Sequence, residues 1–148
     1  METLIAEKKI SQEVSRERVW DLLGTLIFDS LSSMQKLEIM DENNFGAELT
    51  AKAFGIPLAM HLRGEMVDIA PPEALTVKLA ARSKWNLITV VQKITFTISP
   101  TEKGNTTMVC RSVAQDLPFL VRLFLLGQVR AMAGQIFDSI QERLKQLA

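Results

Sequence analysis

The sequence predicts one α+β domain in which an antiparallel sheet of about seven strands is combined with a long C-terminal helix. From Gln35 to Asp116, hydrophobic and polar residues alternate with a period of two, as they do in strands with one buried face. Helical spacing occurs on both sides of that region, over residues 15–31 and from Asp116 to about Leu147. The 148 residues are a normal length for one domain, and a chain of this size buries roughly 70% of its unfolded surface.

The N-terminal part is expected to form a strand over residues 2–12, followed by two short helices. Ser15 should cap the first helix, because its hydroxyl oxygen can accept a hydrogen bond from a free amide of the first turn. Gly24 should end this helix, and the second helix should run to about Leu31. The predicted buried stripe of the first helix consists of Val19, Trp20, Leu22, Leu23 and Leu26.

Turn-forming residues divide the alternating region into strands. Asp, Asn, Gly, Pro or Ser residues gather at 41–44, 54–57, 71–72, 83–86 and 102–105. Between these turns, the alternation separates an inward row of apolar and small residues from an outward row that is more polar. With the N-terminal strand included, about seven strands are expected.

The last helix is expected to begin at Asp116, which would cap it, with Pro118 tolerated in the first turn. It should continue as one helix to about Leu147, and its buried residues should recur at intervals of three and four. This predicted core stripe consists of Val129, Met132, Ala133, Ile136, Ile140, Leu144 and Leu147.

Composition and charge argue against several functional classes. Seventeen Lys and Arg residues balance seventeen Asp and Glu residues without a basic stripe, so nucleic-acid binding is not expected. Cys110 is the only cysteine and His61 the only histidine, so we expect no metal site, and nothing indicates an organic cofactor. The N-terminus lacks the pattern of a signal peptide, and the longest apolar stretch is too short to span a bilayer. We therefore expect a cytoplasmic protein, with peripheral contact to a membrane left open.

The order of the predicted elements resembles the helix-grip fold of the START-like (SRPBCC) superfamily. Four segments carry the resemblance: 14–23 with its Val-Trp pair, the Phe-Gly-Ile-Pro turn at 54–57, residues 62–75, and residues 126–140. Within the superfamily, these segments are most similar to the carbon monoxide dehydrogenase G-subunit family. The resemblance implies a seven-stranded antiparallel sheet wrapped around the C-terminal helix, with residues 1–148 forming a single ligand-binding domain.

Members of this superfamily bind hydrophobic ligands between the helix and the sheet, and the G-subunit family is linked to membrane recruitment of molybdenum hydroxylases. The resemblance therefore implies a non-enzymatic carrier or sensor for a lipid-like or quinone-like molecule. Two alternatives remain open. One is an enzyme of the polyketide cyclase or dehydratase kind that uses the same cavity, and the other is a recruitment subunit that docks on a membrane or on a partner enzyme.

The predicted inward rows contain many small side chains, which leave a cavity unless the helix packs more closely on the sheet. Methionines would let such a cavity adapt to a flexible apolar ligand. Gln92 lies on an otherwise apolar inward row and would contact either the polar end of a ligand or a backbone group. The predicted ligand-binding residues are Ala51, Met60, Leu62, Gly64, Met66, Leu79, Gln92, Ile94, Phe96, Met108, Cys110, Ser112, Met132 and Ile136.

No catalytic residues are predicted. His61 has the outward parity, and the inward rows contain no Asp, Glu, His or Tyr side chain that would serve as a general base. Gln92 and Ser112 are poor bases. An ionisable side chain that pointed inward would favour the enzyme alternative.

One end of the domain is expected to expose apolar side chains, because alternate hairpins of a meander meet at one end. A second apolar stripe lies on the last helix, nearly opposite its core stripe. This stripe consists of Leu120, Phe124, Gly127, Ala131 and Gly134. We interpret this end as a homodimer interface or as a docking surface for a membrane or partner, although loops or the first helices could cover it. The predicted docking residues are Phe54, Ile56, Trp85, Leu120 and Phe124.

Overall fold

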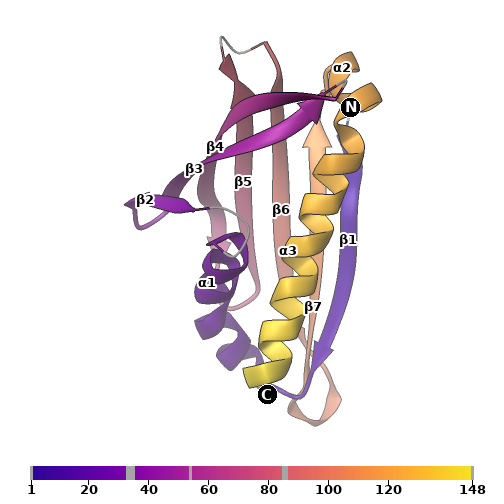
Figure 1. Cartoon of the computed structure of the whole chain (residues 1–148). Coiled ribbons are helices and arrows are strands. Elements are labelled where there is room, and N and C mark those ends of the chain that lie inside the picture. The colour runs from indigo at the N-terminus through magenta and orange to yellow at the C-terminus, as the bar shows by residue number, and fades with distance from the viewer. Residues whose placement is uncertain (1, 33–35, 54, 85–86, 148) are drawn as a thin grey trace.

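In the computed structural model, which describes residues 2–32, 36–53, 55–84 and 87–147, the chain forms a seven-stranded sheet with helices against one of its faces (Figure 1). The strands follow the order β1-β7-β6-β5-β4-β3-β2, and each neighbouring pair is antiparallel. The predicted α+β fold class, with its long C-terminal helix, is confirmed. The elements are β1 (Glu2–Gln12), α1 (Arg16–Ser32), β2 (Leu37–Asp41), β3 (Asn44–Ala53), β4 (Ile56–Ala70), β5 (Ala74–Ser83), β6 (Thr89–Pro100), η2 (Glu102–Gly104), β7 (Thr106–Gln115), α2 (Phe119–Phe124) and α3 (Leu126–Leu147).

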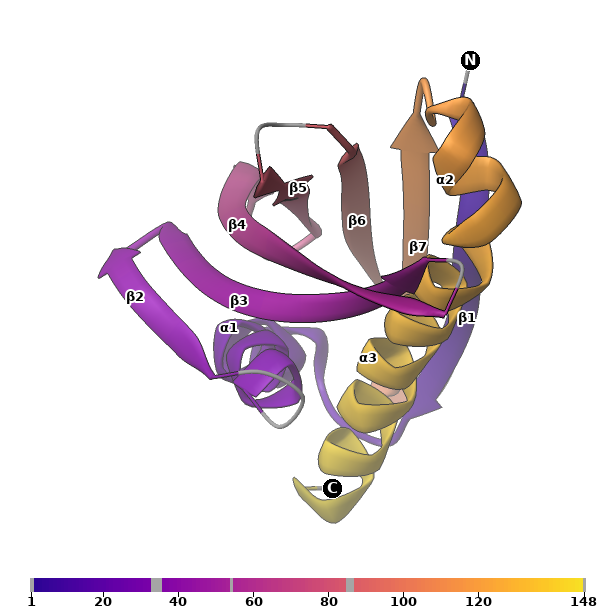
Figure 2. The same cartoon turned by 45° about the horizontal axis from the view of Figure 1, so that its top comes forward.

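The sheet has one face toward the helices and one toward solvent, as the alternation predicts. On β6 and β7, every second residue is buried, from Val90 to Ile98 and from Thr106 to Ala114. Figure 2 shows that the long hairpin of β3 and β4 curves away from the rest of the sheet and reaches across to the N-terminal part of α3. The sheet therefore partly encloses this helix.

Between β1 and β2 the chain forms one continuous helix, α1, rather than the two short helices expected. Ser15 caps it as predicted: the Arg18 amide donates to the Ser15 hydroxyl at 3.3 Å, and the Val19 amide donates to the Ser15 carbonyl at 3.0 Å. Gly24 lies inside the helix on its exposed side. The helix continues past it because buried apolar residues follow, and their burial outweighs the cost of about 1 kcal/mol for a glycine within a helix. The buried residues of α1 are Val19, Leu23, Leu26, Ile27, Ser30 and Leu31.

The C-terminal segment also differs from the prediction, because it forms two helices, α2 and α3, that are separated at Leu125. Asp116 does not cap a helix; it adopts a φ of 50°, and Pro118 precedes the first helical residue instead. Val121 and Leu125 are both almost fully buried in the same core cluster. These two residues are four apart and lie on one face, so the break at Leu125 has no explanation in the burial of their side chains.

The larger part of the core lies where α1 and α3 meet the middle of the sheet. Phe96 of β6 and Phe137 of α3 pack edge to face, with ring centroids 6.3 Å apart. Phe45 of β3 lies over Gly64, its partner in register on β4. A Cβ atom at position 64 would lie only 2.0 Å from the Phe45 ring. Large aromatic rings therefore fill the space that small residues leave in this part of the sheet.

A smaller core cluster lies between α2, the first half of α3 and the strand ends next to them. Alanine is frequent here, in contrast to the aromatic rings of the larger cluster. The buried members of the smaller cluster are Ile5, Ala51, Met60, Val90, Ala114, Leu117, Val121, Leu125 and Ala133.

Candidate ligand-binding pocket

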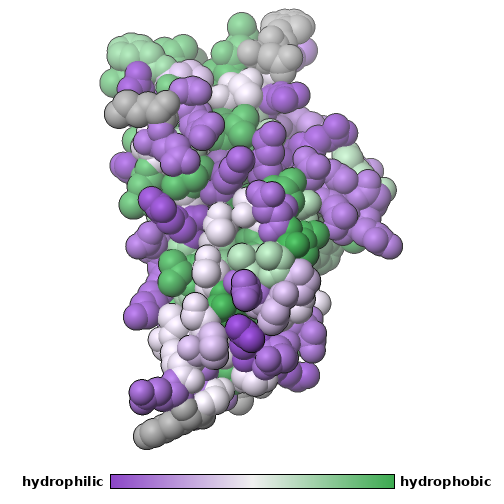
Figure 3. Space-filling model, turned by 180° about the vertical axis from the view of Figure 1, so that it is seen from behind, coloured by the Kyte–Doolittle hydropathy of each residue, from purple (hydrophilic) through white to green (hydrophobic). Residues whose placement is uncertain are grey.

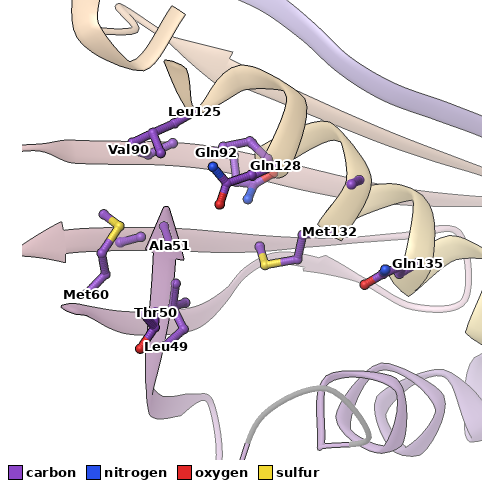
Figure 4. Close-up of a pocket in the computed structure, with 13 residues that line it drawn as sticks. Leu49, Thr50, Ala51, Met60, Val90, Gln92, Leu125, Gln128, Met132 and Gln135 are labelled. Atoms are coloured by element: carbon purple, nitrogen blue, oxygen red, sulfur yellow. The ribbon is translucent and has the colours of Figure 1, made fainter. Parts of the chain in front are cut away.

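A pocket of about 430 Å³ opens between the sheet and the N-terminal half of α3 (Figure 4). Ala51 and Ala81 form part of its wall, and their small side chains leave room below the helix. Met60 and Met132 face the same space from opposite sides. Strand residues that line the pocket are Leu49, Thr50, Ala51, Met60, Ala81, Val90 and Gln92. Helix-side residues that line it are Leu125, Gln128, Val129, Ala131, Met132 and Gln135.

Gln92 is the most deeply buried polar residue of the pocket, with an exposed fraction of 4%. Its Oε1 atom accepts a hydrogen bond from the Ser112 hydroxyl at 2.7 Å. The amide nitrogen carries two N–H donors, and no acceptor among the described residues bonds to it. This nitrogen is not closed off from solvent, and it reaches the open space of the pocket. The pocket wall therefore presents a donor whose hydrogen bond a ligand can complete.

A second glutamine fixes the rim of the pocket. The Gln128 side chain on α3 accepts a hydrogen bond from the Lys52 amide at 3.0 Å, and its Nε2 atom donates to the Lys52 carbonyl at 2.5 Å. These two bonds join the end of β3 to the first turns of α3. They hold the β3–β4 hairpin beside the helix and so define one edge of the pocket.

The polar groups that line the pocket are the amides of Gln92, Gln128 and Gln135 and the hydroxyl of Thr50. None of the lining residues, all of which lie in the described part of the chain, carries an ionisable side chain. Cys110 of β7 belongs to the closed core, where burial raises the pKa of its thiol to about 12 despite the opposing effect of the Lys8 charge. This thiol is therefore protonated and unreactive at neutral pH.

Only part of the predicted ligand-binding set lies at this pocket. Ala51, Met60, Gln92 and Met132 line it. The other ten predicted residues lie in the closed core or pack against it, because the rings of phenylalanines and the helices occupy the space they face. These ten residues are Leu62, Gly64, Met66, Leu79, Ile94, Phe96, Met108, Cys110, Ser112 and Ile136.

Two lining residues that the sequence interpretation missed carry a recognisable signal. Gln128 and Gln135 are seven residues apart, so they lie on one face of α3, beside the core stripe. Polar amides on the border of a buried stripe are positioned to reach a pocket below the helix. Thr50 has no comparable signal, because its parity on β3 is outward.

The apolar end of the molecule is exposed, as predicted for the residues that the structure describes. Ile56 is 65% exposed, Leu120 48% and Phe124 39%, while Phe54 and Trp85 lie outside the described residues. Figure 3 shows hydrophobic side chains at the end of the molecule that carries α2. Further exposed apolar residues near this end are Leu87, Phe119 and Leu123.

Within the described ranges, no helix combines the length and the apolar character that crossing a membrane requires. Nor do three or more His, Cys, Asp or Glu side chains gather there in a group that would hold a metal ion.

No family model matches the chain, and no curated protein matches it. Solved structures do match. A conserved protein from Geobacillus kaustophilus is 18% identical, with a TM-score of 0.68 over 95% of this chain and 94% of that chain. A protein from Deinococcus radiodurans is 11% identical, with a TM-score of 0.60 over 98% and 97%. Norcoclaurine synthase from Thalictrum flavum, in complex with dopamine and hydroxybenzaldehyde, is 15% identical, with a TM-score of 0.59 over 96% and 88%.

These likenesses define the fold: the chain has a helix-grip fold, in which an antiparallel seven-stranded sheet is combined with a long C-terminal helix. At such identities, they establish the fold alone. Membership of the START-like superfamily, and of the carbon monoxide dehydrogenase G-subunit family within it, stays a prediction.

Proposed function

We propose that the protein binds an uncharged, largely apolar small molecule in the pocket between the sheet and α3, as a carrier or sensor. The observation that carries this proposal is the pocket itself, which combines apolar walls with an amide donor on Gln92 that bonds to no described residue. Its volume of about 430 Å³ is within the range of small-molecule sites. Met60 and Met132 have flexible side chains that adapt to an apolar ligand of irregular shape.

The charge and polarity of the lining indicate the class of ligand. A carboxylate would lose its hydration without gaining a cationic partner from the lining residues, which is expensive in an apolar site. A carbonyl oxygen, in contrast, can accept the hydrogen bond that the Gln92 amide nitrogen offers. We infer that the ligand is a neutral ketone, ester or quinone with an apolar body.

A cyclase-like or dehydratase-like enzyme would use the same pocket, and one of the similar structures is that of an enzyme, norcoclaurine synthase. Binding is favoured over turnover by the nature of the polar lining groups. Amides and a threonine hydroxyl do not titrate near neutral pH, so they are weak proton-transfer groups.

Filling the pocket should weaken ligand binding without unfolding the protein. In Ala81→Phe, the new ring should occupy the space beside Val90 and Gln92, and affinity for a long-chain methyl ketone should fall by about tenfold or more. Ala59→Phe is the matched control, because Ala59 lies on β4 with its side chain exposed. Titration calorimetry and native mass spectrometry measure the two affinities and any ligand that co-purifies.

Gln92→Leu tests the ligand class separately. The parent protein should bind the methyl ketone about two to ten times more tightly than the alkane of equal length, because the ketone gains one hydrogen bond. The Gln92→Leu variant should bind the two compounds with similar affinity. The corresponding fatty acid should bind more weakly than the ketone. If the Ala81→Phe and Ala59→Phe variants bind the methyl ketone with equal affinity, the pocket is not the binding site. If the fatty acid binds as tightly as the ketone, the ligand is not restricted to neutral molecules.

We propose secondly that the exposed apolar end docks on a membrane surface. The exposed apolar residues of α2 are Phe119, Leu120, Leu123 and Phe124, and the same helix carries Arg122. Apolar and basic side chains together are typical of helices that lie in a membrane interface. The chain continues from α2 directly into residues that line the pocket. Docking at this end would therefore bring the pocket close to a source of apolar ligands. A homodimer or a partner enzyme would use the same surface.

Charges introduced at this end should weaken vesicle binding. Leu120→Glu combined with Phe124→Glu should reduce liposome flotation by about tenfold or more, because each buried apolar side chain contributes about 1.5–3 kcal/mol. Ile39→Glu with Ile69→Glu is the control, since both isoleucines are exposed but lie away from α2. If the first variant stays folded and floats like the parent, the surface does not bind membranes. A change seen only in sedimentation would assign it to a homodimer instead.

A further inference from the structure

The outer face of the sheet, away from α1 and α3, contains a second hollow of about 430 Å³ over β3, β4, β5 and β6. The strand register explains its position. One row across these four strands consists of Gly46, Arg63, Ala80 and Val91, each opposite the next in register. Arg63 therefore lies between a glycine and an alanine. Ala80 leaves space on one side of the arginine, whereas on the other side the Met40 side chain lies over Gly46. Figure 3 views this side of the molecule, where hydrophilic side chains are numerous.

Three cations are arranged around Ala80 in this hollow. Arg63 is opposite Ala80 on β4, while Lys78 and Arg82 are two residues before and after it on β5. Because side chains alternate along a strand, all three cations project from the same face of the sheet. All three line the hollow, and so does His61, which is opposite Arg82 in register.

The protein neutralises these cations only in part. Among the described residues, none of the three forms an ion pair with an acidic side chain. Arg63 instead donates from Nη2 to the sulfur of Met40 at 3.5 Å. Lys78 faces Glu65 on β4, whose carboxylate also lines the hollow, but it faces Lys93 on β6 as well. Like charges directly opposite each other destabilise a sheet, so this arrangement has an energetic cost that a bound anion would remove.

The charges on this part of the sheet have a net value of +2 when His61 is neutral. The four positive side chains are Arg63, Lys78, Arg82 and Lys93. The two negative side chains are Glu65 and Glu48, and Glu48 faces His61. We propose that this hollow binds the phosphate group of a phosphorylated small molecule or of a lipid. A phosphate monoester carries a charge of about −1.5 to −2 at neutral pH, which matches the excess of positive charge.

The arrangement of the cations favours phosphate over carboxylate. A carboxylate presents two oxygen atoms in one plane and pairs best with a single guanidinium group. A phosphate monoester has three free oxygen atoms that point in different directions, so it can contact Arg63, Lys78 and Arg82 together. The hollow is also larger than one phosphate group, and therefore leaves room for the part of the ligand that is attached to it.

Glycerol phosphate and acetate are the soluble probes, added to the full chain at constant ionic strength and followed by NMR titration. Glycerol phosphate should bind, and acetate should bind about tenfold more weakly. Arg63→Gln combined with Arg82→Gln should reduce glycerol phosphate affinity by about tenfold or more. Arg18→Gln combined with Lys145→Gln is the control, because it removes two exposed cations from α1 and α3 and should change the affinity by less than about twofold.

Vesicles of phosphatidylcholine with and without phosphatidic acid distinguish the sources of the phosphate. Binding that rises with phosphatidic acid and falls in Arg63→Gln/Arg82→Gln would assign the hollow to a lipid headgroup. Binding of glycerol phosphate without this rise would assign it to a soluble phosphorylated molecule. If neither probe binds, or if the control variant loses as much affinity as the test variant, the proposal is wrong. Should the double variant fail to fold, Lys78→Gln provides the same comparison with a single exposed residue.

Discussion

Replacement of Phe137 by alanine should lower the free energy of unfolding by about 3–5 kcal/mol, the usual cost of removing a fully buried phenylalanine ring. Phe137 is 1% exposed and packs edge to face against Phe96, so its loss leaves a cavity between α3 and the sheet. For a chain of this length, the melting temperature should fall by roughly 2–4 °C for each kcal/mol. Urea unfolding followed by circular dichroism measures the change.

Phe119→Ala is the matched control for this measurement. Phe119 is 65% exposed on α2, so the same truncation should change stability by only about 0.5 kcal/mol. A loss below about 1 kcal/mol in Phe137→Ala, similar to the control, would contradict the closed packing of the larger core cluster. It would indicate that α3 can move toward the sheet and fill the space.

Gly64→Ala should destabilise the protein by about 1–3 kcal/mol or more, although alanine is normally the better residue in a strand. The added methyl group would lie 2.0 Å from the Phe45 ring, which is itself buried and cannot move freely. Thermal and urea unfolding of the purified variant measure the loss.

A double-mutant cycle with Phe45→Leu identifies the cause. Leucine removes the ring atoms that the new methyl group would meet, so Gly64→Ala should cost less in the Phe45→Leu background. The coupling should be about 0.5–3 kcal/mol, as for residues in direct contact. Additive effects would show that the loss arises from the backbone at Gly64 and not from its contact with the ring. Gly24→Ala is a useful comparison, because a methyl group added at Gly24 would meet no atom within 4 Å and the change should stabilise α1.

The inward and outward faces of the strands could be predicted from the sequence, because the alternation has a period of two and one face is buried. The inward parity of Gln92 and the outward parity of His61 both agree with the structure. Helix ends were less predictable. Gly24 is a typical helix-ending residue, yet the helix continues through it because tertiary contacts on the opposite face stabilise both halves.

The small inward residues allowed two interpretations, a cavity or close packing, and the structure contains both. Ala51 and Ala81 line an open pocket, whereas Gly64 lies under the ring of Phe45. Cys110 and Ala114 are fully buried in the two core clusters. The composition of the rows could not separate these cases, because the side chain that fills the space above a small residue comes from another element.

The sequence by itself determined the fold class, the face of each strand that is buried and the small size of the side chains that make a pocket feasible. These properties follow from local periodicity and residue volume. Only the tertiary structure decided where the space remains open, that Gln128 joins β3 to α3, and that Arg63, Lys78 and Arg82 surround Ala80. Those features depend on strand register and on the position of α3, which bring together residues that are distant in the chain and have no shared pattern within it.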